Sequence, residues 1–476
     1  MRQALLVLIV LSVLAGCSRG PSPTSGSAQA AYSGEAGAIE KAEASQPRDA
    51  SPHVGKADQA ALVAGNTDFA FSLYQVLRPQ DGNLFFSPYS LSMALAMTYA
   101  GARGETERQM AKALHFKLPQ AKLHPAFDAL DLTLAQRGRG AAGTRGEPFR
   151  LTVANALWGQ QGYHFLPTYL DLLARDYGAG MRLVNFGDPE PARRAINDWV
   201  ANQTNLKIQN LVPPGVIRPG QTMLILTNAI YFDAAWLHRF NPRMNCPGEF
   251  TLLDGKKVGV EMMRQTEEFG YTEGDGYQAV ELPYSDQELS MVILLPRPGR
   301  FDSFDATLSA DRVKKILKGL PPFATTRVAL TMPKLEYESP FTLEKTLAAI
   351  GMYDAFTGAA DFSGMDGKRF LRITDVLHKA LVRVNEEGTQ AAAATAIAMA
   401  GGAAAPSRIV EFTVDRPFIF LIRDRATGAV LFVGRVLNPK GLGRSSLRPR
   451  DGRRARVCPP YTWRSAGPVV LVLVLL

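Results

Sequence analysis

The amino-acid sequence predicts an α+β fold in which helices pack on a large β-sheet. Helical periodicity dominates the first part of the chain and strand-like runs dominate the later part, an order that favours α+β over a fold of alternating helices and strands. No linker rich in Pro, Gly or Ser interrupts residues 61–439. Of the 476 residues, 46% are hydrophobic and 20% are charged, which is ordinary for a globular protein. We therefore expect one large domain over residues 58–440.

Helices are predicted from apolar periodicity and from end signals. Ser87 and Pro88 suit the N-cap and the first position of a helix, and Gly178 suits a left-handed cap after the last turn. Together these signals predict helices over residues 62–77, 88–100 and 167–177, and a further helix that begins at Asp188-Pro189.

Strands are predicted from short runs of apolar and β-branched residues. Asp254-Gly255, which lies between two alternating apolar runs, predicts a tight hairpin turn. The predicted strands cover residues 223–232, 291–295, 328–332, 380–386, 417–422 and 429–436.

Residues 1–17 have the features of an export signal of the lipoprotein type. Arg2 precedes an apolar run, as in a signal peptide. Leu14-Ala15-Gly16-Cys17 resembles the bacterial lipoprotein cleavage box, in which Cys17 would carry the lipid. A plain secretory signal with an incidental cysteine is the alternative. Both interpretations predict export, either to the cell envelope or to the extracellular space, with membrane contact only through the lipid anchor.

The two segments that flank the expected domain are unlike it in composition. Residues 18–57 contain no Leu, Phe or Trp, which predicts a disordered tether. From Lys440 onward eight basic residues accompany one acid, so only +2 of the net charge of +9 falls on residues 1–439. This location argues against nucleic-acid binding by the core. The basic tail, residues 441–476, is either an envelope or polyanion contact or an extension without function.

No pattern of catalytic residues is present. The chain has no HExxH, GxSxG or Walker motif, and its six histidines show no ligand spacing. Three cysteines cannot build a disulfide scaffold, and we do not expect Cys246 in the core to pair with Cys458 in the tail. The sequence therefore predicts neither an enzyme nor a metal or cofactor site.

Residues 385–406 consist almost entirely of small side chains after the strand-like run Leu381-Val-Arg-Val384. Alanine favours a helix, so a short helix or an exposed loop is one interpretation. In an extended chain, however, alternate residues share one face. The residues on the odd-numbered face are all small or apolar, and none is charged. The segment can therefore also enter a sheet, with Gly388 as a pivot. The odd face comprises Thr389, Ala391, Ala393, Thr395, Ile397 and Met399.

Four segments in the same order resemble conserved regions of the serpin family. They cover the entry to a second helix, a central strand, a loop hinge and the carboxy-terminal signature. They read Asn83-Leu-Phe-Phe-Ser-Pro-Tyr-Ser-Leu91, Thr227-Asn-Ala-Ile-Tyr-Phe-Asp-Ala-Ala-Trp236, Val384-Asn-Glu-Glu-Gly-Thr-Gln-Ala-Ala-Ala-Ala-Thr395 and Asp415-Arg-Pro-Phe-Ile-Phe-Leu-Ile422 with Phe432-Val-Gly-Arg-Val-Leu-Asn-Pro439. The resemblance implies a serpin fold, with helices packed on a large mixed central β-sheet, smaller sheets and an exposed reactive-centre loop.

The resemblance also implies a suicide inhibitor of serine proteases. The target would attack the loop and form a covalent acyl complex, and the loop would then insert into the central sheet. Cysteine proteases are possible further targets, because a thioester can be trapped in the same way. The inhibitor is expected to act as a monomer. Insertion requires small side chains on the face of the hinge that becomes buried. The hinge residues matched by similarity are Glu386, Gly388, Thr389, Ala391, Ala393 and Thr395.

Further residues are matched to functional positions by similarity. Ser87, Ser90, Asn228 and His378 match a polar cluster beneath the opening sheet, although ordinary core polar residues are the alternative. Trp236 matches the region where the loop enters, although it is equally compatible with a plain core aromatic residue.

The scissile bond is less well determined. The family spacing from Glu386 places it between Gly402 and Ala403, whereas counting back from Pro417 places it nearer Pro406. The small residues from Ala400 to Ala405 suit elastase-like or subtilisin-like proteases. Arg408 would instead suit a trypsin-like protease, and Met399 is a further option.

Two other functions remain compatible with the sequence. One is a non-inhibitory serpin that binds or carries a ligand, which the small residues at Thr389, Ala391, Ala393 and Thr395 disfavour. The other is a surface lipoprotein that uses the fold only as a scaffold.

Overall fold

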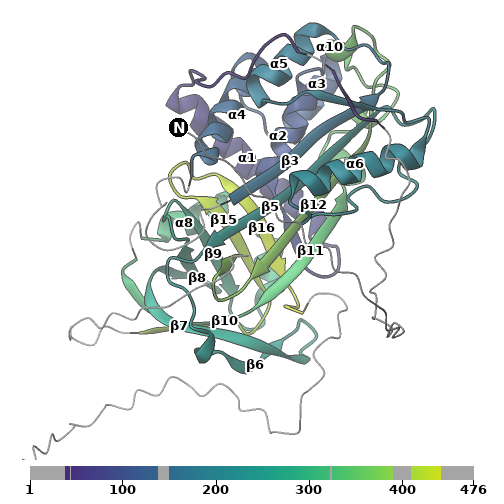
Figure 1. Ribbon diagram of the computed structural model, residues 1–476. Helices are drawn as coiled ribbons and strands as arrows, with labels where there is room; N and C mark the ends of the chain where they lie inside the picture. Colours follow the sequence, from purple (N-terminus) through teal and green to yellow (C-terminus); the bar gives the residue numbers. More distant parts are fainter. Residues whose placement is uncertain (1–37, 43, 138–149, 322–323, 390–408, 441–476) are drawn as a thin grey trace, which may run out of the picture. The chain divides into compact units, whose positions relative to one another are not determined.

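The computed structural model describes residues 38–440 apart from 43, 138–149, 322–323 and 390–408. Helices and mixed β-sheets share this region (Figure 1), so the α+β prediction is confirmed. The helices are α1 (Lys56–Leu77), α2 (Pro88–Tyr99), α3 (Gly104–Ala113), α4 (Gln120–Ala135), α5 (Pro167–Tyr177), α6 (Pro189–Gln203), α7 (Phe301–Ala306), α8 (Ala310–Gly319), α9 (Glu344–Ala349) and α10 (Ser363–Asp366). Two short 3-10 helices are η2 (Pro242–Met244) and η3 (Asp354–Phe356).

The main sheet has seven strands within the described residues. β5 and β12 run parallel and pair directly from Leu224 opposite Ile373 to Tyr231 opposite Leu381. Beyond that point the short strand β13 lies between them and is antiparallel to both. The strands in spatial order are β1 (Glu40–Lys41), β4 (Met181–Val184), β3 (Arg150–Gln160), β5 (Leu224–Ala235), β13 (Gly388–Thr389), β12 (Ile373–Val384) and β11 (Leu335–Thr342).

A second sheet, with nine strands within the described residues, lies behind and below the main one in the view of Figure 1. Its backbone path is β14 (Val410–Thr413), β10 (Thr326–Pro333), β7 (Lys257–Gly274), β8 (Tyr277–Pro283), β9 (Leu289–Pro296), β15 (Phe418–Asp424), β16 (Val430–Val436) and β2 (Leu84–Phe86), and β6 (Cys246–Thr251) pairs with β7.

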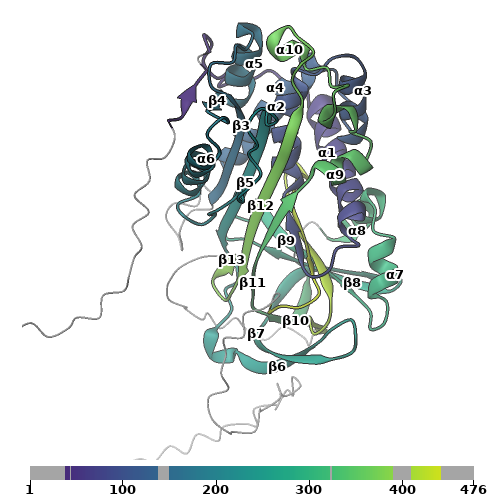
Figure 2. The ribbon, with the colours of Figure 1, turned by 90° about the vertical axis from the view of Figure 1, so that its right-hand side faces the viewer.

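The two faces of the main sheet are covered differently. One face contributes to the large core that the sheets share with α1, α2, α4 and α5. The opposite face carries a smaller apolar core, in which α6 and the segment that follows it pack on β3, β5 and Leu377 of β12. Figure 2 shows α6 beside β3 and β5. Any strand that enters between β5 and β12 must therefore pass beneath this cover.

Local signals predicted several element ends correctly. Ser87 caps α2 by accepting a hydrogen bond from the N–H of Ser90, and α5 ends at Gly178 with φ of 58°. Asp254-Gly255 joins β6 to β7 as a tight turn. The strand predicted over residues 380–386 instead spans Ile373–Val384, because its pairing with β5 extends it toward the amino end.

Two further expectations differ from the structure. Residues 38–55 were assigned to a disordered tether, yet those described lie against β4, α4 and α5. Backbone and charged contacts hold them there, which composition alone does not predict. A bridge between Cys246 and Cys458 was not expected from the sequence, and Cys246 is disulfide-bonded. Within the described region no helix is long and apolar enough to span a bilayer.

Candidate functional site: the loop hinge and the polar cluster beneath it

The chain reverses direction in a tight turn immediately after β12. Asn385 Oδ1 accepts hydrogen bonds from the N–H groups of Glu387 and Gly388, at 3.0 and 3.2 Å, and Asn385 N donates to Gly388 O at 3.0 Å. The turn directs β13 back between its neighbours, so that Thr389 lies opposite both Ala234 of β5 and Val384 of β12. Gly388 and Thr389 of the hinge are therefore already part of the sheet.

Gly388 is required by the closeness of the neighbouring strand. A β-carbon at this position would lie 2.0 Å from Ala234 O and 2.7 Å from Ala235 Cα. Both are backbone atoms, which cannot swing aside as a flexible side chain can. The predicted pivot at Gly388 thus coincides with a position where only hydrogen fits.

Thr389 is fully buried at the end of an aromatic stack. Its Oγ1 lies 2.8 Å from the hydroxyl of Tyr284. The ring of Tyr284 stacks on Trp236, with centroids 4.7 Å apart, and Trp236 Nε1 donates to Asn385 O at 3.0 Å. Trp236, which was matched only to the entry region, thus contacts the turn itself. Tyr284 was not singled out from the sequence, because no local motif surrounds it.

Glu386 is held by an ion pair on the other side of the turn. Lys334 Nζ lies 2.6 Å from its carboxylate, and Asn245 Nδ2 donates to the same oxygen. Burial raises the pKa of Glu386, but the hydrogen bonds from Lys334 and Asn245 outweigh burial and lower that pKa below its ordinary value. Lys334 also pairs with Glu261 at 3.0 Å. These contacts hold the hinge to the junction of β10 and β11.

The four residues of the expected polar cluster form one buried hydrogen-bond network. His378 Nε2 accepts from the N–H of Ser87 at 3.3 Å, so the proton of the neutral ring is on Nδ1, which donates to Asn228 Oδ1. Asn228 Nδ2 donates to Ser90 Oγ at 2.6 Å. Asn155 of β3 completes the network by accepting from Ser90 Oγ at 3.0 Å. Asn155 was not predicted from the sequence, although an amide within the apolar run of β3 was the available signal.

The network connects the start of α2 to strands β5 and β12. Asn228 and His378 are directly opposite in the parallel pairing of β5 with β12, and all four cluster residues have no exposed surface. Burial lowers the pKa of His378 to about 3, so the ring is neutral at physiological pH. The network therefore links β5, β12 and α2 at the centre of the sheet without a buried charge.

Several predicted site residues lie outside the described region. They include the lipidation candidate Cys17, the later hinge residues Ala391, Ala393 and Thr395, and the candidate scissile pair Gly402 and Ala403. No cluster of potential metal ligands occurs among the residues that the structure describes.

Comparison with known proteins gives a consistent result. The model of the family described as serpin (serine protease inhibitor) matches residues 64–439. An uncharacterised serpin-like protein of Thermococcus kodakarensis is 36% identical over 92% of this chain and 99% of its own length. Leukocyte elastase inhibitor A of Mus musculus is 39% identical over 79% of this chain and 99% of its own length. The crystal structure of human thyroxine-binding globulin with bound hormone superposes with a TM-score of 0.71 at 28% identity, covering 80% of this chain and all of that one.

Helices packed on a mixed sheet, with the short strand β13 between the parallel strands β5 and β12, define the fold class of the protein. The family match and the relatives place the chain within a named group of that class. This chain belongs to the serpin family, whose members are mostly protease inhibitors.

Proposed function

We propose that this protein traps serine proteases as a suicide substrate, by inserting its cleaved loop between β5 and β12. The observation that carries the proposal is β13. Gly388 and Thr389 already occupy the first two positions of a new central strand, and the side chains that follow them on the same face are small. Insertion needs no further change of direction, only separation of the two parallel strands.

The register of β13 supports a definite length for the inserted strand. Gly388 pairs with Ala235 and Thr389 with Ala234. At the same antiparallel register, residue 399 would lie opposite Leu224, where β5 begins. The candidate scissile bond between Gly402 and Ala403 would then lie just beyond the end of the sheet. A bond at this position lets the whole strand form while the attached protease stays outside it.

The chemistry would be supplied by the target. Its serine hydroxyl would attack the carbonyl carbon of Gly402, and an ester would form as the bond to Ala403 breaks. The released amine would take its proton from the protease's histidine. About ten further strand residues, from 390 to 399, at ~3.4 Å each would move the ester by roughly 35 Å. This movement would distort the protease before water can hydrolyse the ester.

The target class is proposed from the side chains near the bond. Glycine and alanine suit the shallow specificity pockets of elastase-like and subtilisin-like proteases. Relatives named leukocyte elastase inhibitor, in mouse and frog, support the same class. Cysteine proteases are a secondary target class, because the thioester could be trapped by the same movement. We further propose that the inhibitor is an exported monomer, released or held at the envelope through lipid on Cys17.

The test uses the purified full chain mixed in turn with pancreatic elastase, subtilisin, trypsin and papain. Denaturing gels and intact masses would detect a covalent complex and identify the released peptide. Elastase or subtilisin should form the complex and release a peptide that begins at Ala403. A complex with trypsin alone would move the bond to Arg408 and contradict the target class.

A pair of hinge variants tests the mechanism itself. Thr389→Arg places a charge at a fully buried position, where an unpaired charge costs several kcal/mol. This variant should be cleaved without forming a complex. Gln390→Arg changes the neighbouring residue, which lies on the other face of an extended chain, and should still form the complex. Equal trapping by both variants would contradict the insertion mechanism.

A further inference from the structure

A segment that precedes the family match packs on the edge of the main sheet. We call residues 38–55, residue 43 aside, the N-terminal arm. Its strand β1 pairs with β4, with Glu40 opposite Leu183 and Lys41 opposite Arg182, and the N–H of Ala42 donates to Met181 O at 2.9 Å. The family model begins at residue 64, so the arm lies outside the region that it matches.

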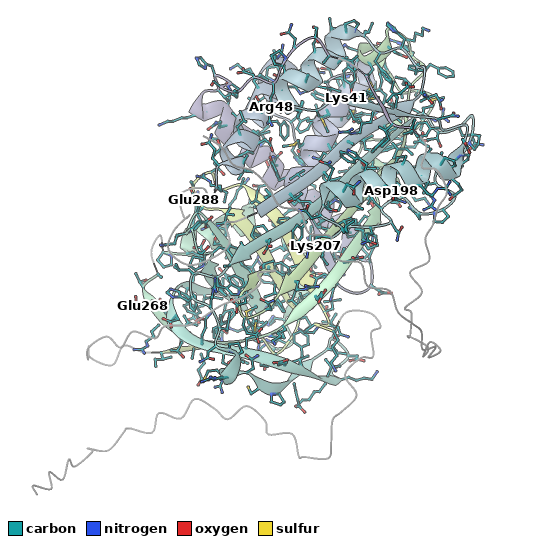
Figure 3. All side chains as sticks on the ribbon, viewed as in Figure 1. Lys41, Arg48, Asp198, Lys207, Glu268 and Glu288 are labelled. Atoms are coloured by element: carbon teal, nitrogen blue, oxygen red, sulfur yellow. The ribbon has the colours of Figure 1, made fainter. Side chains whose placement is uncertain are left out.

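The same arm is bonded to two helices beside the sheet. Ser45 donates to Asp171 of α5 through its N–H at 2.7 Å and its hydroxyl at 2.9 Å, and Asp49 N donates to Arg175 O at 2.9 Å. Arg48 binds two carboxylates of α4, Asp128 at 2.7 Å and Asp131 at 2.6 Å. Figure 3 labels Lys41 and Arg48 at the helix-rich end of the protein.

Two glycines lie beneath side chains of the arm. A β-carbon at Gly178, the C-cap of α5, would lie 2.7 Å from Cδ of Arg48, and one at Gly180 would lie 2.9 Å from Cε of Lys41. The side chains of Arg48 and Lys41 therefore pass close over the backbone of these two glycines.

Arg48 pairs with two carboxylates of α4, and that of Asp128 is the more deeply buried. The side chain of Asp128 has no exposed surface, and its Oδ2 has no hydrogen-bond partner within the described residues. Burial raises the pKa of Asp128 to about 6, and the neighbouring acids Asp131 and Asp176 add to this, whereas Arg48 lowers it. A buried carboxylate that loses its cation is strongly destabilised. The charge of Asp128 therefore depends on the position of the arm.

We propose that the N-terminal arm restrains the main sheet against opening, with Arg48 as its positioning residue. The inference rests on the proposed insertion mechanism. A new strand between β5 and β12 requires these strands to separate by about one strand spacing, ~4.8 Å, which displaces β3 and β4 with β5. The arm bonds β4 to α4 and α5, so a shift of β4 relative to these helices breaks its contacts. The restraint keeps an uncleaved loop from inserting by itself.

The experiment compares the full chain with Arg48→Met and with Arg108→Met. Arg108 forms an exposed ion pair with Glu105 and serves as the control for loss of a charge. Each protein would be incubated at 45 °C, and samples taken over time would be tested for covalent complex formation with elastase. Intact mass would confirm that the loop is uncleaved, and thermal unfolding would report insertion. Arg48→Met should lose activity at least about tenfold faster than the other two, yielding an uncleaved, monomeric and heat-stable form.

A second variant excludes simple failure to fold. Arg48→Met combined with Asp128→Asn removes the arm's charge without leaving a lone buried carboxylate. This double variant should also convert to the uncleaved heat-stable form faster than the full chain does. The proposal would be overturned if both variants convert to the uncleaved heat-stable form at the same rate as the full chain. It would also be overturned if the variants lose activity by aggregation and no heat-stable form appears.

The design separates this inference from the proposed function. Complex formation by the fresh, unincubated full chain tests the proposed function. Conversion to the uncleaved heat-stable form tests the arm, and thermal unfolding detects it even if elastase is never trapped.

Discussion

His378 provides a prediction at the scale of one residue. Its folded pKa is lowered to about 3 by burial, whereas an exposed histidine titrates near pH 6.5. The unfolded chain therefore binds a proton that the folded chain excludes. The contribution of His378 to stability is complete above pH 6.5 and falls by about 1.4 kcal/mol per pH unit as the pH decreases toward 3. Urea unfolding of the full chain between pH 7 and pH 4 would measure this slope.

Comparison with two variants isolates the titration. His378→Gln lacks the titrating group and should show a smaller slope over the same range. His53→Gln changes an exposed histidine and should retain the slope of the full chain. If His378→Gln and the full chain show equal slopes, the neutral buried ring is not the source of the pH dependence.

Gly388 gives a second residue-scale prediction. Gly388→Ala places a β-carbon against the backbone of Ala234 and Ala235, so β13 should leave the sheet. Overpacking of this kind costs about 1–3 kcal/mol. Amide hydrogen exchange at residues 232–236 and 385–389 should accelerate. Gly259→Ala, where a β-carbon would meet open space, should leave that exchange unchanged, and a similar response from both variants would contradict the argument.

At the scale of single residues, the histidine, asparagine and two serines of the polar cluster were expected only through the resemblance to family motifs. The structure joins these four side chains in one network. Tyr284 and Lys334 could not be found in this way. Each lies more than 50 residues before the hinge that it contacts, and a tyrosine or a surface lysine has no distinguishing local pattern.

At the scale of elements, the segment after α6 holds strain that can be removed. Asn205, Leu206 and Asn210 all adopt positive φ, and that of Leu206 is 62°. This conformation costs a β-carbon-bearing residue roughly 1–2 kcal/mol. Leu206 is 64% exposed, so it can be replaced without loss of packing. Leu206→Gly should raise the free energy of unfolding by up to about 1 kcal/mol.

Urea unfolding would measure the change, and Leu206→Ala is the matched control. Alanine removes the exposed apolar side chain but keeps the β-carbon, so its stability should stay near that of the full chain. An equal gain in both variants would attribute the effect to lost surface apolarity rather than to backbone strain.

Element boundaries divide into those that local chemistry determines and those that pairing determines. The ends of α2 and α5 were predictable because Ser87 and Gly178 satisfy backbone groups within one turn. The start of β12 was not, because residues 373–379 become a strand through pairing with β5, about 150 residues away. The arm escaped prediction for the same reason, since short backbone pairing with β4 orders a segment that is poor in large apolar residues.

At the scale of the whole molecule, the described state is one strand short of a complete sheet. β5 and β12 pair directly as parallel strands, while β13 fills only two positions between them. Insertion would replace one parallel pairing with two antiparallel ones and add up to about ten strand residues at the register of β13. At a net 0.5–1.5 kcal/mol per hydrogen bond, the gain is on the order of 10 kcal/mol. Cleavage of the loop should therefore raise the midpoint of thermal unfolding by roughly 20 °C.

Circular dichroism would measure this rise after limited cleavage by a protease that is not trapped. The Thr389→Arg variant, cleaved at the same bond, should gain far less, because the arginine charge cannot enter the buried position that Thr389 occupies. A large and equal gain in both proteins would mean that the cleaved loop does not enter between β5 and β12. No gain in the unaltered chain would show that its sheet does not accept the strand, and trapping could not follow from this fold.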